Sequence, residues 1–584
     1  MRRKNLISRL TTLTLLTLGC LLLALLAPLL LAQRAMDEPF LGYSVMASPR
    51  DLHVITAPIR LSSAPDLKLN RGALYADGNA VVGTPISRFV LDGPVFQLNA
   101  SGLTAASGIE SSSRTDDAGI IAPLIEPLIA MNFDTLIVRR GTLHITSADG
   151  GWETLSDIQA ELNGWRKGHI TARGSLTIRG QRLAFDATLM QTGEKRAHQW
   201  ATKLSIKGDL LEAVLEGQLD TAEDLQLSGQ ADLATPNLRR LARWFGVPVP
   251  TAAGLNATVL KGQMNWARRI VAMEKAKVSV DGNEATGALV LNLAGDRPLV
   301  DGTLAFGALD LTPYVEAARS QSFVFDRQTA SWSTFDLSFP LIKHVDADLR
   351  ISAPKVVIRG YGLGHGAATI TDRSGKLLAE LAELELHAGM ASGQITANAN
   401  ELVPRYALRG KVENMDAGPA TASLLGAAVL SGRATLTLDV VGAGRTPAEL
   451  LHQLSGKAML AVPEGGKLPL DLKALRAAAK GNAQPGWGQM AKGQIGLEPF
   501  EVKATVQGGV LSGELACARS GTTGLAAVGR IDLTDQTLDL HLRVKPSAPT
   551  DRPLQPADVV DGEAIALRGP WLAPFVRAED PINQ

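Results

Sequence analysis

The chain has 584 residues, and its 58 basic side chains balance 58 acidic ones, which excludes proteins that find nucleic acid or an anionic surface through bulk charge. Apolar residues make up 45% of the chain and aromatic residues only 4%, so aliphatic side chains carry the apolar content. The only cysteines are Cys20 and Cys517, which excludes a disulfide framework and a cysteine-based metal site.

The first predicted element is an uncharged apolar run from Leu10 to Gln33. At ~1.5 Å per residue the run extends ~36 Å, enough to cross a hydrocarbon core of ~30 Å as a transmembrane helix. Four basic residues precede it, so the positive-inside rule keeps residues 1–9 in the cytoplasm and places the chain after the run on the far side. In a bacterium with two membranes, the bulk of the chain is then periplasmic and the anchor lies in the inner membrane.

Two other interpretations of this run stay open. A cleaved signal peptide usually has an apolar stretch of about 7 to 15 residues and a small-x-small cleavage site, whereas this run is longer and ends in AQRAMDE. The residues before Cys20 faintly resemble a lipoprotein box, but the apolar run continues well beyond the cysteine. We therefore expect a single-pass anchor over residues 10–33.

Beyond the anchor, short runs of alternating apolar and polar residues are separated by Gly, Asp or Asn. Leu176–Leu189 predicts a hairpin that turns over Arg179–Arg182, and Val278–Leu293 predicts another that turns over Asp281–Asn283, where Asp-Gly supplies the positive φ of a tight turn. The pattern recurs almost to the end of the chain. It predicts a mostly β fold, with a long curled antiparallel sheet that forms an elongated groove or half-barrel.

Few helices are expected, and all are short. Asn237–Phe245 has apolar residues at helical spacing, and Thr446–Glu449 is a capping box with proline at the first helical position, which opens a helix through Leu454. Pro313–Ser320 and Thr421–Leu425 are further candidates. The predicted organisation after the anchor is a β-rich region over 34–330, a second over 331–546, and a segment over 547–584 that completes the sheet.

No local motif for catalysis or cofactor binding stands out. The nine histidines lie at least 21 residues apart, and neither GxxxxGK[ST] nor GxSxG occurs. The most suggestive stretch is LAELELHAGMASGQI, Leu381 to Ile395, where His387 follows Glu385 by two residues. Its acids alternate with apolar residues, as on a solvated strand face. We predict no enzyme, no catalytic residue, no metal and no cofactor.

The same stretch predicts a strand, a turn and a second strand. Ala382, Leu384 and Leu386 are expected on one face, followed by a break over His387–Gly393 and a strand that resumes at Ile395. Similar alternation marks other strands as candidates for the apolar face. The candidate lining residues of an apolar groove are Leu384, Leu386, Ile395, Leu436, Leu438, Leu538 and Leu540.

The order and spacing of several segments resemble the AsmA-like group of inner-membrane-anchored periplasmic proteins, most clearly over about residues 300 to 580. The segments are ALDLTPYV (Ala308 to Val315), VDADLRISAPKVVIRGYGLGHGAATI (Val345 to Ile370), LELHAGMASGQITANAN (Leu384 to Asn400), LLHQLSGKAMLAVPEGGKLPLDLKAL (Leu450 to Leu475), GRIDLTDQTLDLHLRV (Gly529 to Val544) and LRGPWLAPFV (Leu567 to Val576). The amino-terminal half resembles the group only in its general pattern of short strands and glycines.

This resemblance implies a role in maintaining the outer membrane. AsmA-like proteins are similar to bridge-like lipid-transfer proteins, whose long sheet curls into a groove with an apolar floor. The implied partners are the inner membrane, phospholipids and outer-membrane or periplasmic assembly proteins. No catalytic residue is implied.

Three function classes remain to be separated. The first is a carrier of phospholipid acyl chains, and the second is an anchored periplasmic scaffold that modulates targeting and assembly of outer-membrane proteins without carrying lipid. An envelope enzyme is the third, and no residue pair recommends it. Alternation also fits a closed sandwich or barrel, in which the apolar face packs against a second layer and leaves no groove.

Overall fold

The computed structural model describes the following residues of the chain: 52–55, 59–61, 64–77, 88–99, 135–146, 152–163, 169–192, 199–220, 226–247, 249, 254–295, 297–315, 325–326, 331–332, 337, 340–358, 361–425, 428, 430–481, 493–547, 554, 558–559, 561–571 and 573–579. The predicted cytoplasmic segment 1–9 and anchor 10–33 lie outside them. No helix within these ranges is both long and apolar enough to span a membrane.

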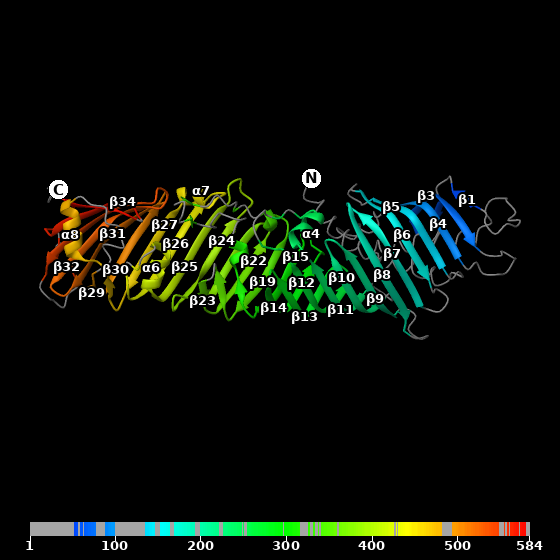
Figure 1. Ribbon diagram of the computed structural model, residues 1–584, viewed down its shortest axis with the longest axis horizontal. Helices are drawn as coiled ribbons and strands as arrows, with labels where there is room; N and C mark the ends of the chain where they lie inside the picture. Colours follow the sequence, from blue (N-terminus) through cyan, green and yellow to red (C-terminus); the bar gives the residue numbers. More distant parts are fainter. Residues whose placement is uncertain are drawn as a thin grey trace, which may run out of the picture. The chain divides into compact units, whose positions relative to one another are not determined.

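Two compact units divide the described residues. The N-terminal unit lies within Met1–Val249, Gly254–Leu304 and His344–Asp346, and the C-terminal unit within Pro250–Ala253, Ala305–Lys343 and Ala347–Gln584. Both units are mostly β (Figure 1). The predicted fold class is thereby confirmed at this level, with a mostly β chain and a few short helices.

In the N-terminal unit, strands that follow one another in sequence pair side by side from β3 to β14. Its strands are β1 (Leu52–Ile55), β2 (Ile59–Leu61), β3 (Ala64–Asp77), β4 (Arg88–Asn99), β5 (Thr135–Thr146), β6 (Trp152–Asn163), β7 (His169–Ile178), β8 (Gln181–Gln191), β9 (Gln199–Gly208), β10 (Glu212–Asp220), β11 (Gln226–Thr235), β12 (Thr258–Ala267), β13 (Ile270–Val280) and β14 (Asn283–Asn292). β15 (Leu299–Phe306) crosses from this unit into the next.

The prediction of a wholly antiparallel sheet is wrong at one position. β4 and β5 pair in parallel, with Leu91 beside Val138 and Phe96 beside Leu143. Parallel neighbours need a crossover connection, and residues 100–134 separate these two strands in the sequence. The sheet is therefore mixed, and the pairings of the described strands do not close it on itself.

The main sheet of the C-terminal unit runs through β19, β22 to β27 and β30 to β35, all antiparallel (Figure 1). These strands are β19 (Asp346–Ala353), β22 (Gly366–Arg373), β23 (Lys376–Leu386), β24 (Gly389–Asn398), β25 (Arg405–Asp416), β26 (Arg433–Ala443), β27 (Ser455–Val462), β30 (Phe500–Gln507), β31 (Val510–Ser520), β32 (Thr523–Asp532), β33 (Thr537–Pro546), β34 (Glu563–Pro570) and β35 (Phe575–Glu579).

Smaller pairings accompany the main sheet. They are formed by β16 (Leu309–Asp310), β20 (Val356–Ile358) and β21 (Tyr361–Leu363), by β17 (Phe325–Asp326) with β18 (Ser331–Trp332), and by β28 (Gly466–Leu468) with β29 (Ile495–Leu497). β16 pairs with β20 in parallel. The other pairings are antiparallel.

Two-residue turns set the register of several hairpins. Both predicted hairpins are confirmed, but their turns are shorter than predicted. Arg179–Gly180 alone joins β7 to β8 and Asp281–Gly282 alone joins β13 to β14, with positive φ at both residues of each turn. This backbone matches the right-handed twist of the flanking strands. His387–Ala388 makes the same kind of turn between β23 and β24, with φ values of 47° and 58°. The predicted break over His387–Gly393 is therefore too long, since β24 already begins at Gly389.

The helices are short, as predicted. Those described are α4 (Leu238–Trp244), α5 (Thr312–Val315), η2 (Pro340–Lys343), α6 (Ala417–Leu425), α7 (Pro447–His452) and α8 (Leu472–Gly481). Thr446 caps α7 by accepting from the Glu449 N–H, which confirms the predicted cap. The Glu449 carboxylate accepts from the N–H of Arg445, the residue before the cap, and not from that of Thr446 as a strict capping box requires. α5 begins at Thr312 and agrees with the predicted helix Pro313–Ser320 up to Val315, and residues 316–320 lie outside the described residues.

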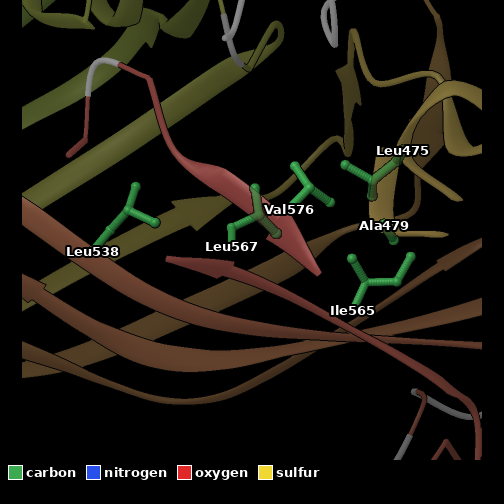
Figure 2. Packing of buried hydrophobic residues seen from close by; sticks show 6 residues of the cluster. All are labelled: Leu475, Ala479, Leu538, Ile565, Leu567 and Val576. Atoms are coloured by element: carbon green, nitrogen blue, oxygen red, sulfur yellow. The ribbon is translucent and has the colours of Figure 1, made fainter. Parts of the chain in front are cut away.

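α8 was not predicted, and it supports the last strands of the sheet. It buries Leu475 and Ala479 against Leu538, Ile565, Leu567 and Val576 (Figure 2). The N–H groups of Lys473 and Ala474 donate to the Asp471 carboxylate, which satisfies the first turn of the helix. This cluster is the main hydrophobic core at the C-terminal end of the unit.

Candidate functional site

The strand register of the C-terminal unit sorts its side chains into two faces of opposite character. Directly paired residues share a face. One row of such pairs crosses ten strands from β23 to β34 and is wholly apolar: Leu381, Gly393, Gly410, Leu438, Ala458, Ala504, Gly513, Gly529, Leu540 and Leu567. A second row on the same face is Ile370, Ala379, Ile395, Leu408, Val440, Gly456, Val506, Leu511, Ile531 and Leu538. We call this side the apolar face.

The row between these two lies on the other side of the sheet and contains only polar residues. Its members are Glu380, Gln394, Arg409, Asp439, Lys457, Thr505, Ser512, Arg530, Asp539 and Arg568. Opposed charges pair across strands, with 3.1 Å between Arg409 and Asp439 and 2.7 Å between Arg568 and Asp539. The hydrogen bond from Arg568 to Asp539 raises the pKa of this guanidinium. This polar face suits contact with water.

Much of the apolar face is accessible. Between β22 and β27, every residue of the two apolar rows is half-buried or exposed, and Ile395 keeps 47% of its surface. Soluble proteins seldom leave a contiguous set of aliphatic side chains in water, and such surfaces mark sites for ligands, membranes or partners. The central strands of the C-terminal unit therefore carry the candidate site.

Two helices cover other parts of the apolar face. α8 packs on Leu538 and Leu567 near the last strands. α6 contributes Ala417 and Ala420 to a cluster with Ala434 and Val462 at the β25–β26 connection. The accessible part of the face thus lies beside regions that the chain itself covers.

The N-terminal unit also carries an apolar row, and between β5 and β11 this row is buried. It consists of Leu136, Leu162, Ala172, Ala187, Leu204, Leu215 and Ala231. None of these residues is more than 8% exposed. The two units therefore share a pattern of residues and differ in how much of the apolar surface is accessible.

Glycines on the apolar face lie where neighbouring backbones approach closely. A Cβ on Gly393 would come within 2.4 Å of the Arg409 carbonyl oxygen, and one on Gly456 within 2.1 Å of the Asp439 carbonyl oxygen. Register shifts interrupt β23–β24 after Leu381 and β25–β26 after Val412. Glycine kinks and β-bulges of this kind increase local bend and twist of a sheet.

The structure places all seven predicted lining residues on the apolar face. Leu384 and Leu436 belong to one row of pairs, Ile395 and Leu538 to another, and Leu438 and Leu540 to a third, while Leu386 is paired with Gly389 at the end of β23. They differ in accessibility, because Ile395 is exposed whereas Leu538 is 6% exposed beneath the α8 cluster.

One residue of the predicted face is misplaced. The bulge in β23 inserts an extra residue at Ala382–Glu383, so Leu381 and Leu384 share the apolar face and Ala382 is exposed. Several members of the face were also missed, among them Leu408 and Val440. The alternation of apolar and polar residues in RYALRGKV and TLTLDVV could have identified Leu408 and Val440 as members of one face. It could not have shown which strands they pair with.

Several titratable groups lie close together on the polar side of the described main sheet. His365 lies 3.7 Å from Glu383 and 3.6 Å from Glu385, and His541 lies 2.8 Å from Glu579. The predicted lone His387 occupies the β23–β24 turn, where its carbonyl accepts from the Asp416 N–H. Among the described ranges, no three His, Cys, Asp or Glu side chains are grouped so that they could hold a metal ion.

Comparison of the chain with family models, with curated proteins and with solved structures finds no match. The accessible apolar face is the feature of the described residues that points most directly to a function. The resemblance to the AsmA-like group remains a prediction from the residues that carry it.

Proposed function

We propose that this chain carries phospholipid acyl chains along the apolar face of its C-terminal unit. In this proposal it is a non-enzymatic envelope protein that supports outer-membrane homeostasis by moving lipid between the inner and outer membranes. The observation that carries the proposal is the wholly apolar row over ten strands, backed by a wholly polar row, with its central part accessible.

The energetics favour a covered path for lipid over free diffusion. Exposing an acyl chain to water costs ~0.8 kcal/mol of free energy per methylene, so exposing two chains of about 15 methylenes each costs on the order of 24 kcal/mol. An aliphatic surface removes most of this penalty without specific contacts. The thirteen strands of the main C-terminal sheet, at ~4.8 Å spacing, would offer a path on the order of 60 Å.

Curvature would turn the face into a groove. Gly393 and Gly456 permit close backbone approach on this face, and the bulges in β23 and β25 add local bend. Alanine and glycine in the first apolar row leave room for a fatty chain. We infer that this sheet curls with the apolar face inside, which is the finer form of the predicted fold.

The proposed location follows from the sequence. An uncharged run over residues 10–33 with basic residues before it suits an inner-membrane anchor, and the rest of the chain is then in the periplasm. An anchored carrier gains from this geometry, because one end of its path stays near the membrane that supplies or receives lipid.

A periplasmic scaffold for outer-membrane protein assembly is the second candidate. It draws on the edge of the main sheet, since β35 pairs only with β34 within the described part of the chain. A sheet edge can accept an added strand from a partner through main-chain hydrogen bonds. This function needs no lipid on the apolar face.

A matched pair of substitutions in β24 separates the two candidates. Ile395 and Thr396 are adjacent, both exposed, and on opposite faces of the sheet. We expect Ile395→Asp to reduce co-purifying phospholipid by at least about tenfold, because a buried carboxylate beside an acyl chain costs more than ~1.4 kcal/mol. Thr396→Asp should leave the lipid content unchanged.

The measurement is mass spectrometry of lipids bound to the full-length protein after gentle extraction. Circular dichroism and the unfolding midpoint of each variant control for misfolding. Equal lipid content in the two variants would contradict carriage on the apolar face, and a folded parent protein without any bound lipid would favour the scaffold.

A further inference from the structure

The connection between β24 and β25 carries the most exposed large apolar side chain of the described residues. Leu402 is 90% exposed, and its neighbour Val403 is 43% exposed. Two residues are enough to close such a hairpin, as they do between β22 and β23, but residues 399–404 form this connection. We call these residues the β24–β25 loop. Its additional length presents two aliphatic side chains to water.

Hydrogen bonds brace the backbone of the β24–β25 loop against the connection that follows β26. The Leu402 carbonyl oxygen accepts from the Arg445 guanidinium at 3.0 Å. The Pro404 carbonyl oxygen accepts from the Gly444 N–H at 3.1 Å, and Pro404 is buried. The exposed pair therefore lies on a held backbone, which presents Leu402 without a further loss of chain entropy on binding.

Three cations and two carboxylates lie beside the exposed pair. Lys376 begins β23, Arg405 begins β25, and both strands pair at these residues with the end of β24. Lys376, Arg405 and Arg445 are all exposed. Glu401 pairs with Arg405 at 2.8 Å, and the Glu449 carboxylate accepts from the Arg445 N–H at 2.8 Å. Aliphatic side chains with a cationic surround suit the interface of an anionic phospholipid membrane.

The β24–β25 loop also adjoins the accessible part of the apolar face. Tyr406 lies on that face, since it pairs with Ala397 and follows the loop by two residues. Further along the same hairpin, Ile395 pairs with Leu408 in one of the two accessible rows. A surface that touched the loop would therefore lie beside the apolar face.

We infer that the β24–β25 loop docks the C-terminal unit onto a phospholipid surface. Leu402 and Val403 enter the upper part of the acyl layer, and the neighbouring cations meet the phosphates. Burial of both aliphatic side chains favours this contact, and each cation near an anionic leaflet adds to it. A protein interface of standard size buries roughly 800 Å² on each side, which two side chains at a tip do not provide. This inference goes beyond the proposed function, because docking requires no lipid on the apolar face.

The first test measures insertion of the β24–β25 loop directly. A fluorescent probe is attached to Leu402→Cys in full-length protein with Cys20→Ser and Cys517→Ala, reconstituted in bilayers of phosphatidylethanolamine and phosphatidylglycerol. We expect lipids spin-labelled on their acyl chains to quench this probe at least about threefold more than the same probe at Thr396→Cys. Thr396 is exposed on the polar face of β24, which makes it the matched control. Equal quenching at the two positions would overturn docking and leave a protein partner as the occupant.

The second test separates docking from lipid that the protein carries. Spin-labelled lipid on the apolar face would also quench a nearby probe, and Ile395→Asp is expected to deplete that lipid. Quenching at position 402 should persist in this variant. Its loss would show that the probe met carried lipid, and docking would be overturned. Persistent quenching in a folded parent protein that binds no phospholipid would instead overturn the proposed function and leave docking intact.

The third test asks whether Leu402 itself drives insertion. With the probe moved to Val403→Cys, we expect Leu402→Asp to reduce quenching by about fivefold or more, because a carboxylate opposes entry into the acyl layer. Val441→Asp should leave quenching unchanged, since Val441 is 51% exposed but lies in β26 on the polar face. Both variants should unfold at the midpoint of their parent. Unchanged quenching in Leu402→Asp would contradict docking through this tip.

Discussion

At the scale of single residues, the paired glycines of β24 and β25 differ in how much room each has for a side chain. A Cβ on Gly393 would lie 2.4 Å from the Arg409 carbonyl oxygen, whereas one on Gly410 would lie 3.3 Å from the Ser392 carbonyl oxygen. We expect Gly393→Ala to lower the free energy of unfolding by about 2 kcal/mol or more, because backbone must shift. Gly410→Ala should stay within about 1 kcal/mol.

Chemical denaturation followed by circular dichroism measures both variants. The two residues face each other across one pair of strands, so each is the natural control for the other. Equal losses would contradict the view that close backbone approach selects glycine at Gly393.

Cys517 offers a second prediction at this scale. Burial, with a smaller contribution from Asp558, raises the pKa of the Cys517 thiol. A raised pKa leaves less thiolate at pH 8, so we expect reaction with a thiol reagent to be slower than for free cysteine and to accelerate as the pH rises. A Cys20→Ser background isolates the signal. Reaction as fast as in the denatured protein would contradict this prediction.

Residue patterns predicted the face of a side chain wherever alternation was uninterrupted. Leu436 and Leu438 lie on one face because β26 is regular at that point. Alternation failed at Ala382, since the bulge that displaces it depends on pairing with β22 and β24 and leaves no local mark in LAELELH. The accessibility of Ile395 likewise depends on what other segments cover.

At the scale of elements, α8 holds the last strands through one fully buried leucine. Leu475 is 0% exposed and belongs to the cluster of Leu538, Ile565 and Val576 (Figure 2). We expect Leu475→Ala to lower the free energy of unfolding by about 2 to 5 kcal/mol, through lost burial and the cavity left behind. Lys480→Ala, at an exposed position of the same helix, should change it by less than about 0.5 kcal/mol.

Thermal unfolding followed by circular dichroism checks this pair of α8 variants. If Leu475→Ala were as stable as Lys480→Ala, α8 would not support the sheet in solution.

Local chemistry explains which elements were predictable. The α7 helix was found because Thr446 and Glu449 satisfy its first turn by themselves, and the β7–β8 turn because Gly180 adopts positive φ readily. α8 was missed although Asp471 caps it. Its apolar positions read equally well as short strand, and the surface that it covers comes from strands far along the chain.

The parallel pairing of β4 and β5 also lay beyond prediction. Each strand alternates in the same way whichever direction its neighbour runs. The pairing depends on the path of the chain between the two strands, and alternation contains no information about that path.

At the scale of the whole molecule, the two units differ in how much apolar surface remains for a ligand. Leu136 and its row are buried in the N-terminal unit, whereas Ile395 and its row are accessible in the C-terminal unit. A ligand that binds only the folded state stabilises the unit to which it binds. Phospholipid should therefore stabilise the C-terminal unit alone.

Calorimetry of lipid-stripped full-length protein tests this expectation. Because each unit has its own buried core, we expect two unfolding transitions, with Leu136→Ala lowering one and Leu475→Ala the other. Phospholipid at about 100 times its dissociation constant should raise the second midpoint by roughly 5 °C or more and leave the first within about 1 °C. Equal rises would place lipid on both units. No rise in either midpoint would contradict phospholipid binding to the accessible apolar face.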